Sequence, residues 1–235
     1  MPTKAAYHHG NLKPALIAAG LKEIAQHGIE GFSLRGVARR AGVSAPAVYR
    51  HFADRDDLVA AIAMEAWERL MSMIADAMAK APPEPLEQFR ANGVTLVRFA
   101  VANPEYFRVI CMPGAFDRAP ADFRAKWEAA EAANRQALAD AQAQGVIANI
   151  PLDQLMLAAN ATVMGLAHSI IEGRLGKVDD ARATELANVV TQVLGVGLIP
   201  RDGDTFDPTI GTTVKGTAKK LRKDSLRSSP ARKLE

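Results

Sequence analysis

The sequence predicts an all-α protein made of a small N-terminal part and a larger C-terminal helical part. Apolar residues recur at helical spacing along the chain, and no segment shows a convincing strand pattern. Three residues that commonly cap helices, Ser33, Ser44 and Asp54, lie close together near the N-terminus. Apolar residues make up 49% of the 235-residue chain, which is enough for a packed helical core.

The first of these capped helices begins after Ser33. Leu34, Val37, Ala38 and Ala41 recur at i, i+3, i+4 and i+7, so one face of this helix is apolar. Gly42 then ends the helix and begins a tight turn. A short helix that ends at a glycine and is followed at once by another cap is typical of two helices packed across each other.

The second helix follows Ser44 and has one inward and one outward face. Val48 and Phe52 lie four residues apart, so both turn toward the first helix. The outward positions are Pro46, Ala47 and Arg50, flanked by Tyr49 and His51. Small, aromatic and basic side chains on one free face are typical of a helix that enters a DNA groove. The alternative is a compact helical hairpin with no nucleic-acid role.

The run AGVSAPAVYRHFADRDDL, residues 41–58, resembles the TetR (tetracycline-repressor-like) family of bacterial transcription regulators. The preceding segment, Asn11 to His27, is similar to the helix that comes before this motif in the family. NPEYFRVI and IIEGRL, later in the chain, resemble pieces of the family's ligand-binding half. The resemblance implies an N-terminal three-helix helix-turn-helix DNA-binding domain and a C-terminal ligand-binding and dimerisation domain. Repression is the family's commoner mode of action.

Two groups of candidate DNA-binding residues follow from the motif. Residues that resemble phosphate-positioning groups are Ser33, Ser44, Tyr49, His51 and Arg55. Candidates for base recognition are Arg35, Ala45, Pro46, Ala47 and Arg50. Apolar groups can contact thymine methyls and an arginine can bridge a guanine edge, so Arg50 is the first candidate for sequence discrimination.

Charge divides the chain into three parts. Residues 1–55 hold eight Lys or Arg against three acids, whereas residues 56–199 hold twelve against eighteen. Because DNA attracts the first and repels the second, we expect a DNA-binding domain over 1–55 and an effector-binding and dimerisation domain over 56–199. Residues 200–235 carry nine bases and five acids in a Gly-, Ser- and Thr-rich stretch, which predicts a disordered tail. This tail either attracts phosphate or only aids solubility.

The C-terminal part is expected to consist of long helices bounded by proline and glycine. The first runs from Arg55 to about Lys80 and is ended by Pro82 and Pro83. The others are predicted over Leu86–Ala102, Pro104–Met112, Ala121–Gln144, Leu152–Glu172 and Ala181–Leu198, with a loop from Pro113 to Pro120.

The last two helices predict a homodimer. Together they present more apolar surface than one thin domain can cover, and the first of them carries the small residues Ala158, Ala161 and Gly165. Such helices pair closely, so we expect a four-helix bundle to which each subunit gives two, as the family resemblance also implies. A two-fold pair of headpieces would then read an inverted-repeat operator. The alternative is that both helices are internal core.

Aromatic and methionine residues in the C-terminal part are candidates for the lining of a pocket that binds a small-molecule effector of unknown identity. The candidates are Phe99, Phe107, Met112, Phe116, Phe123, Trp127, Asn160, Met164 and His168, with Tyr106 and Met156 near them. Residues of this kind fill cores at the same spacing, so packing is the open alternative. Asn160 and His168 stand out as polar side chains on an otherwise apolar helix.

Other function classes find little support. The chain has no H-E-x-x-H, C-x-x-C, G-x-S-x-G or G-x-G-x-x-G motif, so we expect neither an enzyme nor a metal or other cofactor. A single cysteine, Cys111, excludes an internal disulfide and suggests a small core residue. No uninterrupted apolar run is long enough to span a bilayer, so we expect a cytoplasmic protein that does not bind membranes. A DNA binder without any effector stays open as the competing hypothesis.

Overall fold

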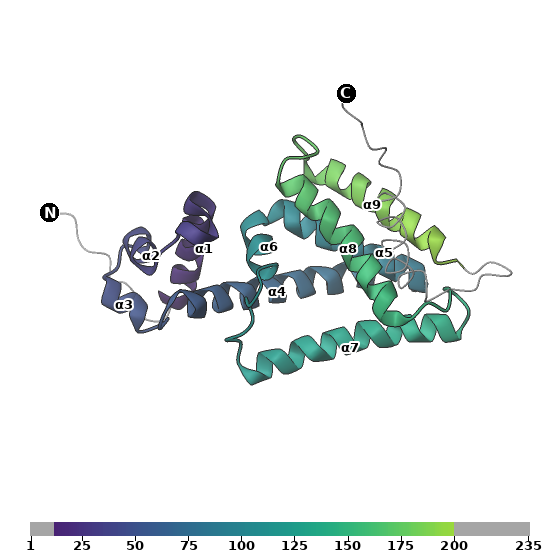
Figure 1. Ribbon diagram of the computed structural model, residues 1–235, viewed down its shortest axis with the longest axis horizontal. Helices are drawn as coiled ribbons and strands as arrows, with labels where there is room; N and C mark the ends of the chain where they lie inside the picture. The colour runs from purple at the N-terminus through teal and green to yellow at the C-terminus, as the bar shows by residue number, and fades with distance from the viewer. Residues whose placement is uncertain (1–11, 200–235) are drawn as a thin grey trace, which may run out of the picture.

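The computed structural model describes residues 12–199, and within this range it contains nine helices and no strand (Figure 1). The predicted all-α fold is therefore confirmed. The helices are α1 (Leu12–Gly31), α2 (Leu34–Ala41), α3 (Ala45–Tyr49), α4 (Arg55–Lys80), α5 (Pro85–Ala102), α6 (Pro104–Ile110), α7 (Ala121–Ala143), α8 (Leu152–Ile171) and α9 (Asp180–Gly197). The predicted tail, 200–235, and the opening residues 1–11 lie outside the described range.

The helices form two parts joined by α4. Figure 1 shows α1, α2 and α3 gathered at one end as a headpiece, residues 12–54, and α5 to α9 at the other end as a helical body. The 26-residue helix α4 begins beneath the headpiece and runs into the body. Any movement of α4 relative to the body therefore moves the headpiece as well.

One apolar core holds the headpiece together and continues past it. Val37 and Val48 are fully buried against Leu58 and Ile62 from the first two turns of α4. The same cluster includes Val109 of α6 and Ala115 of the following loop. The expected domain boundary at residue 55 thus falls inside a single packed core, and α4 belongs to both parts.

The body is built around α5. On one side, Phe99 of α5 and Phe107 of α6 pack with Leu70 of α4 in a core that excludes solvent. On the other side, Val97 packs with Ala187 and other buried residues of α8 and α9. Helix α7 lies along the edge of the body, and its only buried residues are Phe123, Leu138 and Ala141 (Figure 1).

Helix boundaries agree with the predicted ones to within about two residues wherever a cap or a proline marks them. Helix α4 spans Arg55–Lys80 as expected, because the Asp54 side chain accepts a hydrogen bond from the Asp57 backbone N–H at 3.0 Å. Asp57 in turn accepts one from the backbone N–H of Ala53, at 2.9 Å. Helix α1 continues to Gly31 only across a kink at Gly28, so its straight part ends where the predicted helix ends.

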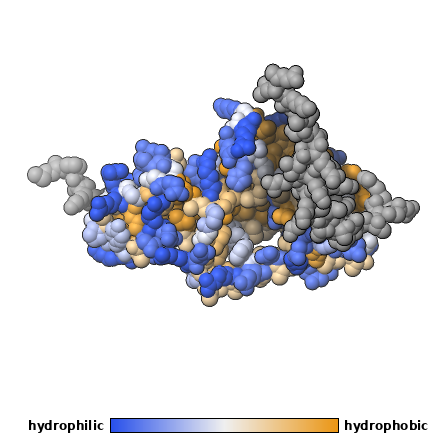
Figure 2. Space-filling model, in the orientation of Figure 1, coloured by the Kyte–Doolittle hydropathy of each residue, from blue (hydrophilic) through white to orange (hydrophobic). Residues whose placement is uncertain are grey.

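Helix α8 combines high hydropathy with incomplete burial. It is long and apolar enough, with a mean hydropathy of 1.3, to cross a membrane by length and composition, and 33% of that stretch is buried. Its inner face packs Val163 and Ala167 against α5 and α6. In Figure 2 hydrophobic surface is visible on the body. These properties suit a helix buried on a second face by another copy of the chain.

Cys111 follows α6 and is half-buried. Burial raises the pKa of its thiol to about 11, so the thiol stays protonated at neutral pH. Because the thiolate is the reactive form, Cys111 behaves as a small core residue, in line with the sequence-based expectation.

Candidate nucleic-acid interface

Helix α2 is held at both ends by the features that the sequence indicates. The Ser33 hydroxyl accepts a hydrogen bond from the Gly36 backbone N–H at 3.1 Å. At the other end Gly42 adopts φ 69°, and the N–H of Val43 donates to the Ala38 carbonyl at 3.0 Å. Only glycine adopts this left-handed geometry without strain, so Gly42 fixes the angle at which the chain leaves α2.

Ser44 is in the N-cap position of α3 but does not cap the helix with its side chain. Its hydroxyl makes no capping hydrogen bond, and only its carbonyl accepts one, from the Ala47 N–H at 3.0 Å. The expected side-chain cap is therefore wrong. Pro46 lies in the first turn and removes one of the N–H groups that such a cap would satisfy, which reduces the need for it.

Helix α3 ends at Tyr49, earlier than the predicted helix that carries Phe52, and the predicted inward and outward faces extend over α3 and the turn that follows it. Val48 and Phe52 are buried, at 0% and 2% exposure. Pro46, Arg50 and His51 are exposed, Tyr49 is 51% exposed, and Ala45 and Ala47 are half-buried. Figure 1 shows α2 and α3 at the end of the molecule farthest from α8 and α9. The outward face of α3 can therefore approach a duplex without interference from the body.

The arginines on this surface differ in whether their side chains already have hydrogen-bond or ion-pair partners within the protein. Arg35 and Arg50 are exposed and make no side-chain hydrogen bond or ion pair with any residue between 12 and 199. Arg39 is equally unpaired and lies one turn after Arg35, a spacing that sequence analysis could have used to include it. Since most arginines of the described chain are paired, guanidinium groups left free on α2 and α3 suit an external anionic partner.

Arg55 is engaged within the headpiece. Its Nη2 donates to the Ile29 carbonyl at 2.6 Å, and its guanidinium lies 4.5 Å from the centre of the Phe32 ring. These contacts join the end of α1 to the start of α4. A role in phosphate positioning stays a prediction, and it would use the guanidinium nitrogens that these contacts leave free.

A buried carboxylate fixes α2 against α1. Glu23 is 3% exposed, and its Oε1 accepts a hydrogen bond from Arg40 Nε at 2.8 Å. His27 Nδ1 lies 3.4 Å from the other oxygen. Gly36 makes room for this carboxylate, since a Cβ added there would lie 2.2 Å from Glu23 Oε2. Sequence analysis missed this group, because residues 23, 36 and 40 are brought together only by folding.

We expect Gly36→Ala to lower the free energy of unfolding by about 1–3 kcal/mol, because the methyl group must displace a buried, paired carboxylate. Urea denaturation at equal protein concentration measures this. Gly195→Ala is the matched control, since no atom outside its own helix turn lies within 4 Å of that Cβ. A Gly36→Ala protein as stable as the control would show that Glu23 is not confined as described.

The body is tied to the headpiece by Arg118, in the loop between α6 and α7. Its guanidinium lies 2.8 Å from an Asp54 oxygen, 3.0 Å from Asp57 and 3.6 Å from Asp56. The Asp57 backbone N–H first, and Arg118 next, lower the pKa of Asp54. A lowered pKa keeps this carboxylate charged at neutral pH, and its stabilising effect is lost only as the pH falls through that pKa. The three aspartates lie at the start of α4, a few residues after α3. A shift of the body that moves Arg118 can therefore change the position of α3 through this contact.

A second tie joins α6 to α4. The Tyr106 hydroxyl donates to Glu65 Oε1 at 2.6 Å, and the Arg69 guanidinium lies 4.9 Å from the centre of the Tyr106 ring. Burial first, and then the bond to Glu65, raise the pKa of Tyr106 well above its ordinary value. The phenol therefore remains a hydrogen-bond donor at any physiological pH.

The structure does not bring the nine predicted ligand-binding residues into one site. Phe99 and Phe107 are fully buried core, Met164 packs on them, and the His168 ring meets Phe107 edge to face. Phe116 stacks on both Phe123 and Trp127, and Met112 lies beside Phe116 in a shallow groove. Only Asn160 lines the cavity between α5, α7, α8 and α9. Helical spacing of aromatic residues is the same in a core and in a pocket, so the sequence could not separate them.

Comparisons with known proteins agree with this geometry. Residues 16–62 match the family model of the bacterial regulatory proteins of the tetR family. HTH-type transcriptional regulator Rv1816 of Mycobacterium tuberculosis is 28% identical over 98 residues, which is 40% of this chain and 40% of that protein. The matched region thus spans about two fifths of the length of this curated relative.

Solved structures resemble the whole described fold. A protein with unknown function from Rhodococcus sp. RHA1 is 28% identical, with a TM-score of 0.67, over 84% of this chain and 100% of that chain. A TetR family transcription regulator from Marinobacter aquaeolei VT8 is 20% identical, with a TM-score of 0.63, over 80% of this chain and 96% of that chain. At 20% identity, the similarity to the Marinobacter protein supports only a shared fold.

Proposed function

We propose that the chain is a regulator of the TetR family, because residues 16–62 match the family model, and that it acts as a dimeric cytoplasmic repressor that binds an inverted-repeat operator. We further propose that a small-molecule effector releases it from DNA. The observation that carries the proposal is the outward face of α3, where Arg50 is exposed and unpaired beside Pro46 and Ala47.

In the proposed complex, only a few side chains recognise the DNA sequence. Arg50 and Arg35 bridge guanine edges in the major groove, and Ala45, Pro46 and Ala47 contact thymine methyls. The phosphate-positioning residues are Ser33, Ser44, Tyr49, His51 and Arg55, to which we add Arg39. Support comes from their exposure on one end of the molecule, apart from the acidic body.

The proposed dimer forms through the outer faces of α8 and α9. Leu157 of α8 is 69% exposed, and on α9 Val189, Val193 and Val196 are 53%, 69% and 48% exposed. The three valines recur at i, i+4 and i+7, so they form one stripe along α9. Large apolar side chains left in water on two adjacent helices support a bundle with a second copy. They also argue against the alternative in which both helices are only internal core.

Release by an effector requires a mechanical path from body to headpiece. The ties of Arg118 to the start of α4 and of Tyr106 to Glu65 provide such a path, since both connect the α6 region to α4. An effector that favours a different position of α6 and α7 would shift the spacing of the two headpieces and with it the affinity for the operator.

Arg118→Ala should weaken operator binding by roughly two- to tenfold, because the headpiece loses a contact that restricts its orientation. Fluorescence anisotropy on a labelled operator measures the affinity. Arg124→Ala removes an unpaired arginine from α7 and controls for the change in net charge. Equal affinities of the two variants would show that the Arg118 contact does not position the headpiece.

Selection of bound duplexes from a random pool tests the proposed function. We expect enrichment of an inverted repeat whose half-sites are related by the two-fold axis of the dimer. Enrichment of a single unrepeated site, or of no sequence at all, would contradict it.

A further inference from the structure

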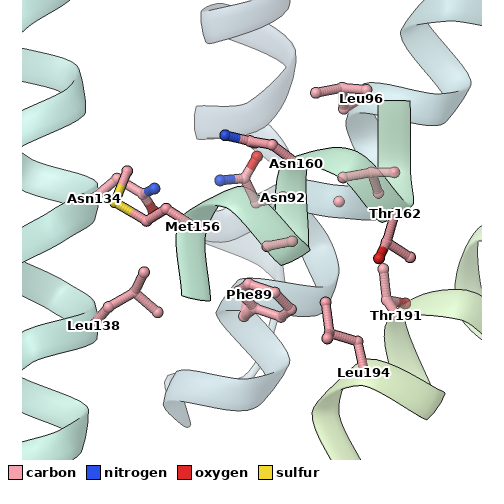
Figure 3. A pocket seen from close by; sticks show the side chains of 13 residues that line it. Phe89, Asn92, Leu96, Asn134, Leu138, Met156, Asn160, Thr162, Thr191 and Leu194 are labelled. Atoms are coloured by element: carbon pink, nitrogen blue, oxygen red, sulfur yellow. The ribbon is translucent and has the colours of Figure 1, made fainter. Parts of the chain in front are cut away.

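A cavity between α5, α7, α8 and α9 has the properties of a binding site for a small ligand (Figure 3). Its volume is about 60 Å³. That is room for about four to six water-sized groups. Phe89, Leu138 and Met156 supply much of its apolar wall. A cavity of this size admits a compound of few heavy atoms, or the end of a longer one.

Three asparagines from three helices line this cavity, of which Asn92 is half-buried and Asn134 and Asn160 are exposed to solvent. Figure 3 shows Asn92 of α5 close to Asn160 of α8, with Asn134 of α7 nearby. No hydrogen bond joins any of these three side-chain amides to another residue between 12 and 199. Each amide offers both donors and an acceptor. The cavity therefore holds more hydrogen-bonding capacity than the fold itself uses.

Two threonines at the cavity are already committed within their own helices. The Thr162 hydroxyl donates to the Ala158 carbonyl at 2.8 Å, and the Thr191 hydroxyl donates to the Ala187 carbonyl at 2.7 Å. Their hydroxyl hydrogens are thus not available to a ligand. Donation of a hydrogen bond to a ligand in this cavity therefore depends on the asparagines, whereas the threonine oxygens can still accept one.

None of the residues that line the cavity is charged. A carboxylate or an ammonium group that entered it would lose part of its hydration without gaining an ion pair, which is costly. A neutral carbonyl, amide or hydroxyl group would exchange its water for an asparagine amide at little cost. The lining therefore favours uncharged ligands over charged ones of the same size.

We propose that this cavity binds a small uncharged molecule that carries a carbonyl, amide or hydroxyl group on a short apolar part, and that this ligand is the effector. The second half rests on the proposed function. Because α7 contributes Asn134 and Leu138 and continues from the loop that holds Arg118, a ligand that draws α7 toward α5 and α8 pulls on the contact with Asp54.

Three compounds of one carbon skeleton test the charge selection: butanamide, butanoate and butylammonium at pH 7. Protein labelled with ¹⁵N at asparagine side chains reports binding through the resonances of Asn92, Asn134 and Asn160. We expect saturable shifts of these resonances with millimolar butanamide and none with the two ions. Shifts with butanoate equal to or larger than those with butanamide, or no shift of these three resonances, would overturn the proposal.

Variants at Asn160 separate recognition from folding. Asn160→Leu should weaken butanamide binding by about fivefold or more, because an amide partner is lost. Asn160→Asp should lose butanamide and gain butylammonium, since the carboxylate supplies the missing ion pair. The control Asn149→Leu, at an exposed position away from the cavity, should bind butanamide as the wild type does. Unchanged binding by both Asn160 variants would contradict the assignment.

The same experiment distinguishes failure of the ligand site from failure of the proposed function. If the wild-type protein binds its selected operator but butanamide shifts none of the three resonances, the proposed repressor function stands and the proposed ligand site is refuted. If butanamide shifts these resonances but the protein binds no DNA, the proposed repressor function is refuted and the proposed ligand site is supported. Saturating butanamide that shifts all three asparagines should weaken operator binding, and unchanged affinity would refute the effector role.

Discussion

Arg50→Ala is expected to weaken binding to the selected operator by about 1–3 kcal/mol and to relax base preference at one position of each half-site. The reason is that the Arg50 guanidinium is exposed, unpaired and carried by the outward face of α3, so its donors are available to a guanine edge. Arg35→Ala should have a similar effect at another position, from α2. Competition binding against single-base variants of the operator measures both changes.

The matched control for this prediction is Arg124→Ala. Arg124 lies on α7, is exposed and has no side-chain partner among residues 12–199, so its loss changes the net charge equally without touching α2 or α3. Its operator affinity should stay within about twofold of wild type, as expected for a distant surface charge. If Arg50→Ala instead weakened all sequences equally, Arg50 would be a phosphate contact and base recognition would have to come from elsewhere.

Val193→Lys is expected to dissociate the dimer and, through that, to abolish operator binding at micromolar protein concentration. Val193 is 69% exposed in the single chain and lies in the middle of the valine stripe on α9. By two-fold symmetry, each dimer would have to bury two ammonium groups without partners. This should raise the dimer dissociation constant by about a hundredfold or more.

Sedimentation velocity measures this change directly, and circular dichroism checks that the variant still folds. Ala132→Lys is the control, because it adds the same charge to an exposed position of α7. A Val193→Lys protein that remains dimeric would place the dimer interface elsewhere. Wild type that is monomeric at micromolar concentration would remove the proposed bundle altogether.

The sequence predicted those parts of the fold that local chemistry determines. Asp54 and the prolines after residue 81 set both ends of α4, and Gly42 set the turn between α2 and α3. Val48 and Phe52 are buried as their spacing indicates, which left Pro46 and Arg50 outside. These features depend on residues within one or two helical turns, so periodicity and capping suffice to find them.

Contacts between distant segments were beyond reach of the same reasoning. Arg118 meets Asp57 across 61 positions of sequence, and no local pattern marks either residue as a partner of the other. Ser44 has a capping residue type but no side-chain cap, because Pro46 alters what the helix start requires. Of the three asparagines at the cavity, the sequence pointed only to Asn160, because the three come from different helices and most of the predicted aromatic residues belong to a core.

The central claim is that a pair of α3 helices inserts Pro46, Ala47 and Arg50 into two major grooves of the operator. Methylation of guanine N7 by dimethyl sulfate blocks contacts in the major groove, so interference mapping on the selected operator tests the claim most directly. We expect two symmetric interference sites, one helical turn or a multiple of it apart, and loss of one guanine from each with Arg50→Ala. Specific binding that tolerates methylation of every guanine, or binding no tighter than that to bulk competitor DNA, would contradict the claim.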